Sequence, residues 1–544
     1  MMTHLKRLGH WIDRNILELG REMRLSYLPP LMVYVAAGVS GLTNIVGTFF
    51  VKEYLGLTAE FLAALGFWAG MPWTLKMPLG HIVDLIWRYK SVLVFIGAAL
   101  IATSLLIMIG LLAYPEEMRQ YLSAEVWFVI STILAPTGYV VQDVVADAMT
   151  VEAIPRFDLK GQAYNPETTR LMHTTMQTLG RVAIIVGGIS VALLNVFLFK
   201  GSASLSENEK VQVYIDIYQL AMIIPLISIM GVSLGLYLKW RELKRRHNER
   251  PALEATGEMT NKALKKPRPN RWILGGSLVF VVFTLSMGLG HFPFNQEIIF
   301  VGSLAIILFL MFRLVQELSA EAHRTLVGTA VIIFVYRAMP TPGPGATWWM
   351  IDTLGFDPQF LSVLALIGGI LTLFGMFIFR RFMAEKSIAY VAAVLTVASS
   401  ILSLPIIGMY YGLHEWTAGL TGGIVDARFI AIVDTALESP LGQIAMIPML
   451  AWIANSAPAH LKATYFAVMA SFTNLALSAS QLGTKYINRI FTVSREVKDP
   501  TSGAVNTAAD YSELGILLIT VTLLVFSVPL ITIAIVGRSK LNSA

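Results

Sequence analysis

The chain of 544 residues contains no cysteine. A disulfide framework, a thiolate metal site and a cysteine nucleophile are therefore excluded. The sequence also lacks a Gly-x-x-x-x-Gly-Lys-Ser/Thr phosphate loop, and its nine histidines show no metal-binding spacing. These absences argue against an ATP-driven pump and a metalloenzyme, and we expect no cofactor.

Charged residues are scarce as well. They make up 14% of the chain, against about 25% in ordinary soluble proteins, whereas hydrophobic residues make up 55%. The net charge of +6 comes from basic residues that fall between apolar segments instead of forming a stripe on a soluble domain. The composition predicts a polytopic protein of the lipid bilayer and does not indicate nucleic-acid binding.

Apolar runs long enough to cross a bilayer are abundant. A membrane-spanning helix needs roughly 20 predominantly apolar residues. Fourteen segments meet this requirement and predict an all-α polytopic membrane protein with about 14 transmembrane helices. Their approximate bounds are 31–51, 60–86, 91–114, 124–152, 173–199, 213–240, 272–291, 296–316, 325–349, 360–380, 388–411, 425–455, 462–488 and 512–537.

The distribution of basic residues predicts the orientation of these helices. Lysine and arginine are concentrated in the cytoplasmic loops of membrane proteins. Here they mark the even-numbered gaps between apolar segments, above all residues 241–271, so both termini are expected in the cytoplasm of an inner membrane or its equivalent. The gap 489–512 fits this pattern less well, because it contains Arg489, Arg495 and Lys498.

A basic linker and an internal repeat indicate the domain organisation. Leu-Gly followed by Phe-Leu occurs in residues 54–62 and again in 353–361, about 300 residues later. Two six-helix halves in parallel repeat are typical of major facilitator transporters, whose substrate site lies between the halves near the midplane. The expected parts are 1–30, a cytosolic amphipathic helix or a plain tail without signal-peptide character; 31–240, the first half; 241–271, the cytosolic linker; 272–324, an inserted helix pair; and 325–544, the second half.

Three acidic residues lie in or at the end of the apolar segment 138–155. They are Asp143, Asp147 and Glu152. A charge at the centre of a membrane helix costs roughly 2.5–3.5 kcal/mol, so such residues usually face a protein interior or a water-filled cavity. Asp143 and Asp147 are four residues apart and share one helix face. We interpret the three acids as candidates for proton coupling or gating in a transporter.

Other charged residues in apolar segments extend this polar route. Lys76 is expected at a depth similar to that of Asp143, and an ion pair would spare both from isolation. Arg181 is a candidate gating residue, or it extends its side chain to the cytoplasmic interface. Asp434 and Glu438, again four apart on the corresponding helix of the second half, suit proton coupling.

A cation and two aromatic residues are candidates for substrate contact. Arg337 stands just before a proline-rich stretch, residues 340–344, where freed backbone groups are tolerated if a helix lines a cavity. Its alternative role is a structural pair with a buried acid. Trp73 and Tyr336 could stack on a flat heterocycle, although interfacial belts account for most membrane tryptophan and tyrosine.

Several of these segments resemble the folate-biopterin transporter family. Residues 72–84 follow Pro-Trp-x-x-Lys-Pro-x-x-Gly-x-x-x-Asp except at Met77, and residues 143–152 follow Asp-Val-Val-x-Asp-x-x-x-Val-Glu. The segment 463–474 is similar to a third family segment. The resemblance covers most of the chain and implies a folate- or pterin-like substrate, with Asn474 among the substrate-binding residues.

One segment differs from the pattern of this family, and two others resemble patterns of other transporters. Residues 460–464 read His-Leu-Lys-Ala-Thr, whereas the family often has Gly-x-Glu-Ala-Thr. The Gln-Asp-x-Val-x-Asp pattern at 142–147 is shared with muropeptide permeases. Gly80, Asp84 and Arg88 resemble the major facilitator loop signature, in which Asp84 and Arg88 would act in gating, or they are solvated loop residues.

Together these features predict a secondary transporter. We expect a monomeric, proton-coupled carrier of a folate- or pterin-like organic anion that works by alternating access. A muropeptide-permease-like transporter of another solute is the main alternative. A polytopic membrane transferase is a weaker one, because such an enzyme would not need two parallel six-helix repeats.

Overall fold

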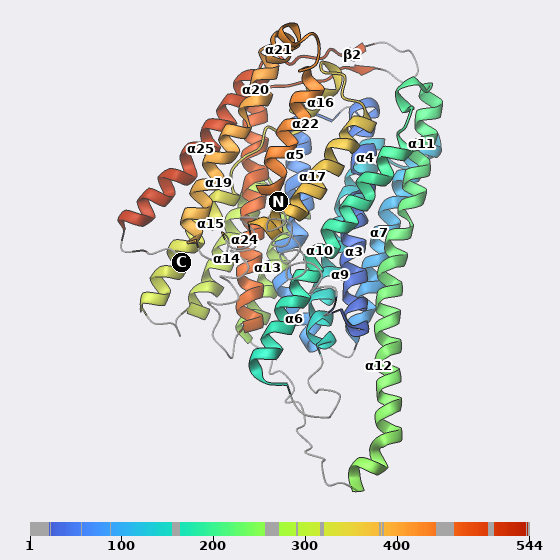
Figure 1. Ribbon diagram of the computed structural model, residues 1–544, viewed down its shortest axis with the longest axis vertical. Coiled ribbons are helices and arrows are strands. Elements are labelled where there is room, and N and C mark those ends of the chain that lie inside the picture. Colours follow the sequence, from blue (N-terminus) through green and yellow to red (C-terminus); the bar gives the residue numbers. More distant parts are fainter. Residues whose placement is uncertain are drawn as a thin grey trace, which may run out of the picture.

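The computed structural model is a bundle of long helices that run roughly along its longest axis (Figure 1). It describes the chain from Arg21 to Leu541 except for some stretches, and beside these stretches some helical residues are described by their backbone alone. Outside the description are residues 1–20, 22, 56, 75, 87–88, 155–163, 256–270, 290–291, 316–319, 380–381, 383–385, 442–461, 499–504, 540 and 542–544.

Three helices of the first half begin at recognisable capping residues, among them α9 and α10. Ser123 and Asn165 accept hydrogen bonds from backbone N–H groups in the first turns of the helices that follow them, which satisfies donors that a helix start leaves unpaired. The helices are α3 (Leu28–Val39), α4 (Asn44–Tyr54), α5 (Ala59–Thr74), α6 (Lys76–Leu85), α7 (Lys90–Ala113), α8 (Pro115–Arg119), α9 (Ala124–Ala153), α10 (Pro166–Leu198), α11 (Glu207–Ala221) and α12 (Ile223–Ala255).

The remainder of the chain is built in the same way, with Asp357 and Asp426 as caps of two helices. Its helices are α13 (Arg271–Leu289), α14 (Asn295–Val315), α15 (Ala320–Arg337), α16 (Pro344–Asp352), α17 (Pro358–Ile378), α19 (Ile388–Leu402), α20 (Leu404–Tyr410), α21 (Leu413–Thr421), α22 (Ala427–Glu438), α24 (Lys462–Ile490) and α25 (Leu514–Arg538). Two short antiparallel strands, β1 (Val497–Lys498) and β2 (Val505–Thr507), lie between the last two helices.

The all-α prediction is confirmed, and these two strands form the one sheet in the part of the chain that the structure describes. Nine helices among the described residues are long and apolar enough to span a membrane. The number fourteen stays a prediction, because several expected spans are divided into two helices and the span 425–455 enters a stretch outside the description. The proposed domain boundaries likewise stay a prediction.

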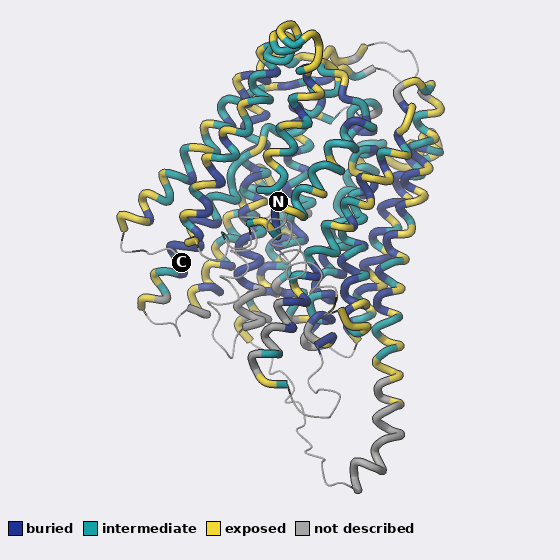
Figure 2. The backbone as a smooth tube through the Cα atoms, viewed as in Figure 1, coloured by how far each residue is buried: buried dark blue, intermediate teal, exposed yellow. Residues whose placement is uncertain are grey.

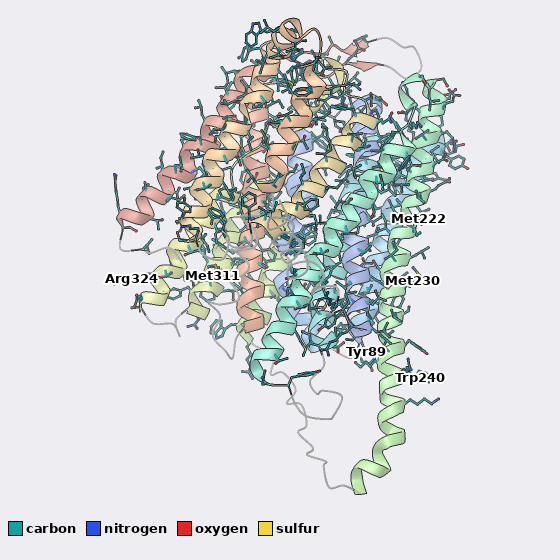
Figure 3. All side chains as sticks on the ribbon, viewed as in Figure 1. Tyr89, Met222, Met230, Trp240, Met311 and Arg324 are labelled. Atoms are coloured by element: carbon teal, nitrogen blue, oxygen red, sulfur yellow. The ribbon has the colours of Figure 1, made fainter. Side chains whose placement is uncertain are left out.

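The two ends of the bundle differ. At one end α12 projects beyond the other helices, and we name this the linker end, since the basic linker follows Ala255 (Figure 1). At the opposite end lie β1 and β2, and we name it the hairpin end. Met230 and Trp240 on α12 are 52% and 57% exposed and point away from the bundle, which suits a surface in contact with lipid (Figure 3).

Small residues allow close helix packing inside the first half. A Cβ at Gly97 on α7 would lie 2.6 Å from the carbonyl oxygen of Gly138 on α9, and a Cβ at Gly138 would lie 2.6 Å from the carbonyl oxygen of Gly97. Such close backbone approach is the usual way in which membrane helices gain packing energy. It positions α9, which carries the acidic residues, against α7.

The two halves meet along two helix seams. Helices α5 and α6 pack against α24, and α10 packs against α17. The helices α13 and α14 lie beside the first seam, where α14 packs on α24 and α13 on α6. Buried residues are concentrated where the helices face each other, and exposed ones along the outside (Figure 2). The first seam brings the Lys76 segment next to the second half.

Helix α24 supports the interruption between α15 and α16. The hydroxyl of Ser480 donates to the Met339 carbonyl at 2.6 Å, and the Asn488 amide donates to the Pro342 carbonyl at 3.2 Å. Thr484 accepts a hydrogen bond from the Thr341 backbone N–H at 3.0 Å. Backbone groups freed by the prolines are thus satisfied inside the protein, as a membrane interior requires.

Gly343 is the position in this interruption that only glycine fits. Its φ of +78° with ψ of −172° is a conformation that L-residues rarely adopt, and a Cβ there would lie 2.7 Å from Nδ2 of Asn488. We expect Gly343→Ala to lower the free energy of unfolding by about 1–3 kcal/mol. Thermal unfolding in detergent measures this loss. Gly419→Ala, a helical site with nothing within 4 Å of the added Cβ, is the control and should have little effect. Equal melting temperatures for the two variants would contradict the strain argument.

Candidate functional site

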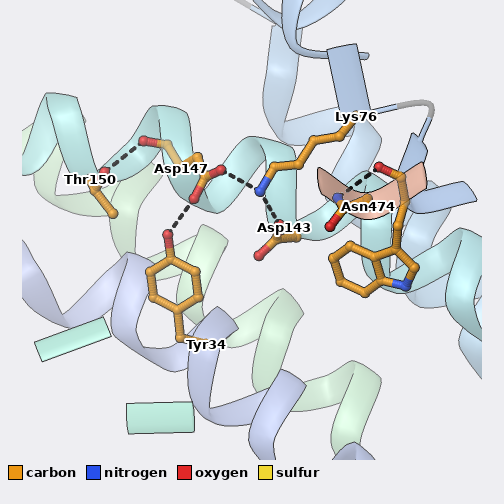
Figure 4. Close-up of polar contacts among 7 residues, drawn as sticks. Tyr34, Lys76, Asp143, Asp147, Thr150 and Asn474 are labelled. Atoms are coloured by element: carbon orange, nitrogen blue, oxygen red, sulfur yellow. Dashed lines mark hydrogen bonds and ion pairs between the residues drawn. The ribbon is translucent and has the colours of Figure 1, made fainter. Parts of the chain in front are cut away.

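The centre of the candidate site is a lysine held by two carboxylates. Nζ of Lys76 lies 2.6 Å from Oδ2 of Asp143 and 2.7 Å from Oδ2 of Asp147 (Figure 4). The side chains of Lys76 and Asp143 are 19% and 17% exposed, and that of Asp147 is 37% exposed. The predicted pair between Lys76 and Asp143 is confirmed. Sequence reasoning missed that Asp147 shares the same cation.

The local backbone explains why Lys76 reaches both acids. Proline has no N–H, so Pro72 inside α5 removes one helical hydrogen bond a turn before Lys76. Lys76 is the first residue of α6. Asp143 and Asp147 lie one turn apart on the same face of α9, so a single ammonium group can lie between them. The sequence spacing alone predicted this shared face.

Tyr34 adds a fourth side chain to this group. Its hydroxyl donates to Oδ1 of Asp147 at 2.7 Å, and its side chain on α3 is only 6% exposed. Thr150 donates to the backbone carbonyl of Asp147 at 2.6 Å. We name Tyr34, Lys76, Asp143 and Asp147 the acid cluster. Tyr34 was not among the predicted residues, because a lone tyrosine in an apolar run carries no signal that distinguishes it from a packing residue.

The third predicted acid lies apart from the acid cluster. Oε2 of Glu152 is 2.7 Å from Nζ of Lys90 at the start of α7, and its Oε1 is 3.7 Å from Nζ of Lys239 on α12. Lys90 is 4% exposed. Glu152 therefore joins α9 to α7 and α12 in the first half.

Gln142 is buried and hydrogen-bonded to two neighbouring helices. Its amide nitrogen donates to the Val94 carbonyl on α7 at 3.2 Å, and its amide oxygen accepts a hydrogen bond from Ser228 on α12 at 2.9 Å. The residue is 2% exposed. Gln142, the first residue of the Gln-Asp-x-Val-x-Asp pattern, thus holds α9 to α7 and α12. The two acids of the pattern, Asp143 and Asp147, bind Lys76 instead.

Two arginines from opposite halves come within electrostatic range of each other. Arg181 on α10 interacts with Asp143 on one side and with Arg337 on α15 on the other. Arg337 is partly buried, as are its neighbour Tyr336 and the more distant Trp73. Arg181 is therefore within electrostatic range of both the acid cluster of the first half and the candidate cation of the second.

The other predicted site residues are less connected. Asp434 and Glu438 lie close enough on α22 to interact electrostatically, but among the described residues no ion pair joins either to a basic side chain. The side chain of Asp84 and all of Arg88 lie outside the described residues, as do residues 460 and 461. The proposed loop signature is therefore not described by the structure.

A second polar group joins the halves at the hairpin end. Nζ of Lys52 on α4 is 2.5 Å from Oδ1 of Asp352 on α16, and the Tyr511 hydroxyl donates to Oδ2 of the same carboxylate at 2.5 Å. Burial and this carboxylate raise the pKa of Tyr511, which keeps the hydroxyl protonated as a donor. The Lys52–Asp352 ion pair crosses from the first half to the second.

Arg495 completes this connection. It is 2% exposed, and its guanidinium donates to the carbonyls of Lys52 at 2.7 Å and Leu57 at 2.9 Å. The same group lies 4.6 Å above the ring of Trp348 on α16, a cation–π geometry. Burial lowers the pKa of Arg495 to about 10, so the group stays charged at neutral pH. Arg495 is thus a buried structural cation, which gives a physical reason for the misfit of the basic gap 489–512.

Charged side chains thus lie inside a helical bundle, next to the seam between two halves. Solved structures agree in fold. A peptide transporter of the POT type in complex with sulfate has a TM-score of 0.55 at 15% identity, with 94% of each chain covered. A bacterial homologue of human drug peptide transporters has a TM-score of 0.53 at 12% identity. The major-facilitator-like fold prediction is confirmed.

The chain belongs to the BT1 family, whose model matches residues 37–541. It is 22% identical to the folate-biopterin transporter of Synechocystis sp. over 478 residues, which cover 87% of this chain and 76% of the relative. It is 27% identical to folate transporter 2 of Plasmodium falciparum over 158 residues, a third (33%) of that relative. The predicted resemblance is confirmed.

These findings define the protein class. The chain is a multi-pass integral membrane transporter of a small molecule, and its relatives are transporters and not enzymes. The prediction of a transporter rather than a transferase is confirmed.

Cross-linking across the hairpin end tests whether the halves must separate there. We expect a Lys52→Cys, Asp352→Cys pair joined by a short thiol-specific bifunctional reagent to stop transport, with recovery after reductive release, because this contact crosses the halves. The chain has no other cysteine. Solute flux in vesicles is the measurement. The control pair is Asp357→Cys with Arg428→Cys, a 2.8 Å ion pair within the second half. Unchanged flux with the first pair cross-linked would show that this contact stays closed during transport.

Proposed function

We propose that the protein is a proton-coupled carrier of a folate- or pterin-like organic anion that works by alternating access. The names of its relatives, a folate-biopterin transporter and a folate transporter, support the substrate class. The observation that carries the coupling part is the single lysine shared by two carboxylates in the acid cluster. We further propose a monomer with both termini in the cytoplasm and without a nucleic-acid partner.

The charge of the acid cluster favours uptake of one proton. One ammonium and two carboxylates carry a net charge of −1, and a membrane interior penalises uncompensated charge. A proton on one carboxylate leaves a neutral ion pair and a neutral acid. Asp147 is the better acceptor, because its side chain is more exposed than that of Asp143. Asp143 then retains Lys76.

Arg181 provides a route by which substrate and proton can influence each other. Its charge lowers the cost of the ionised acids, since it interacts with Asp143. An anionic substrate near Arg181 and Arg337 would offset that charge and so favour proton uptake by the acid cluster. Such mutual dependence is what symport requires.

The substrate side is formed by residues of both halves. A folate has glutamate carboxylates at one end and a flat heteroaromatic ring at the other. Arg337 suits the carboxylate, because a guanidinium donates two parallel hydrogen bonds and stays charged when partly buried. Tyr336 and Trp73 suit the ring. The contacts at the hairpin end correspond to a state closed at that end, which the topology prediction assigns to the outside.

The coupling proposal predicts different effects for the two acids. Asp147→Asn should abolish uphill accumulation driven by a pH gradient while it preserves solute exchange, because the residue can no longer exchange a proton. Asp143→Asn should instead lower stability or disturb gating, since it removes the more buried partner of Lys76. Uptake and counterflow by reconstituted protein, with a melting curve for each variant, separate these effects. Full accumulation by the Asp147 variant would contradict the coupling role.

The substrate proposal predicts ligand-dependent effects at Arg337. Arg337→Lys keeps the charge but loses the two-pronged hydrogen bonding, so folate binding should weaken roughly tenfold or more. An unconjugated pterin lacks the carboxylates and should be affected much less. Binding of both ligands to the same purified variant is the measurement.

Two outcomes of this binding experiment would contradict the substrate proposal. Equal losses for folate and pterin would mean that Arg337 is structural. Failure of the folded wild type to bind either ligand would move the assignment to another organic anion.

A further inference from the structure

Helices α13 and α14, the pair predicted as an insertion, contact both halves of the protein. Phe280 of α13 and Ile299 of α14 share one buried apolar cluster with Phe67 of α5 and Leu482 of α24. Helix α14 also packs along α24, and α13 packs on α6. The pair therefore lies across the seam that α5 and α24 form between the halves.

The side-chain amide of Gln296, near the start of α14, joins the two halves directly. Its Nε2 donates to the Ala64 carbonyl of α5 at 3.0 Å, and its Oε1 accepts a hydrogen bond from Nζ of Lys485 on α24 at 3.1 Å. Gln296 is 5% exposed. Ala64 lies in the early turns of α5 and Lys485 in the late turns of α24, so this bridge lies toward the hairpin end (Figure 1).

The two ends of this bridge differ in strength. Glu297, the next residue, accepts hydrogen bonds from Nζ of Lys485 at 2.9 Å and from the Tyr486 hydroxyl at 2.7 Å. Hydrogen bonds of ionised groups are roughly twice as strong as neutral ones, so α14 is held firmly on α24. The bond from Gln296 to the Ala64 carbonyl is neutral at both atoms and is the weaker link.

A neutral link to the first half suits a contact that has to open and close. An amide donates and accepts at once, so one side chain binds the backbone of α5 and the cation of α24. When the bond to Ala64 breaks, the Glu297–Lys485 ion pair remains intact and no charge loses its partner. The two helices approach closely at this level, since a Cβ at Gly66 of α5 would lie 2.7 Å from Oε1 of Gln481 on α24.

We infer that Gln296 is a positioning residue that fastens α5 to α24 and stabilises the state closed at the hairpin end. When the hairpin end opens, the bond to Ala64 breaks, and the start of α14 stays on α24 through Glu297 and Lys485. This inference rests on the proposed alternating access and is independent of the substrate and the coupling ion. It gives the α13–α14 pair a role in transport.

The test measures the separation of the halves at the hairpin end. Spin labels at Asn208→Cys on α11 and Leu420→Cys on α21 report it, because both residues are exposed and lie at that end in opposite halves (Figure 1). The chain has no other cysteine. Distances are recorded in lipid nanodiscs without substrate. The variants are Gln296→Met and Gln296→Leu, which both remove the amide.

We expect both variants to raise the ratio of the longer to the shorter distance roughly three- to tenfold, the range for one hydrogen bond. Lys485→Met should raise it as well, and Gln296→Met added to it should have no further effect, because the two residues are links of one bridge. The matched control is Ser303→Ala on α14, which should leave the ratio unchanged. Ser303 is 0% exposed, and its hydroxyl has no hydrogen-bond partner in the part of the chain that the structure describes.

A reference variant makes the possible failures distinguishable. Lys52→Met breaks the Lys52–Asp352 ion pair at the same end, and a melting curve verifies that each variant is folded. If Lys52→Met favours the longer distance and the Gln296 variants do not, or if the effects at Gln296 and Lys485 add, Gln296 only contributes packing. If neither the wild type nor Lys52→Met shows the longer distance, the proposed alternating access fails and the inference fails with it.

Discussion

The structure depends on one electrostatic constraint: the ammonium group of Lys76 lies among membrane-spanning helices and is held by two carboxylates. Removing one partner of a buried ion pair typically costs about 3–5 kcal/mol, because it leaves the other charge without compensation. Three helices are arranged around this requirement. Helix α9 presents both acids on one face, α6 carries Lys76, and α3 adds the Tyr34 hydroxyl. The surplus negative charge that remains is what makes the cluster a candidate proton acceptor.

Helix α24 packs against and hydrogen-bonds to several other parts of the fold. The interruption between α15 and α16 leaves backbone groups that a membrane interior does not solvate. Ser480 and Asn488 of α24 donate to carbonyls of this interruption, and Asn474 of α24 donates to the Trp73 carbonyl of α5. The same helix packs along α5 and α6, and α14 packs on it in turn. Contacts across the seam at α24 and at the hairpin end, where Arg495 is buried, are therefore the contacts that any rocking of the halves has to change.

The sequence predicted features that follow from periodicity and from the cost of charge in lipid. The all-α bundle, the shared face of Asp143 and Asp147 and the pairing of Lys76 with Asp143 belong to this group, since each follows from spacing or depth along a helix. Contacts between distant segments were not predictable in this way. Tyr34 and Arg495 are common residue types in membrane proteins, and their partners depend on how distant helices pack. Arg495 was read as a loop charge, whereas its burial against Trp348 makes it a structural cation.

Proton movement during solute uptake tests the account most directly. Purified protein is reconstituted into liposomes that contain a pH-sensitive dye, and folate is added outside without an imposed gradient. The account predicts acidification of the lumen that depends on folate and disappears in the Asp147→Asn variant, which still exchanges folate. Folate uptake without any accompanying change of lumenal pH would contradict the proposed role of the acid cluster.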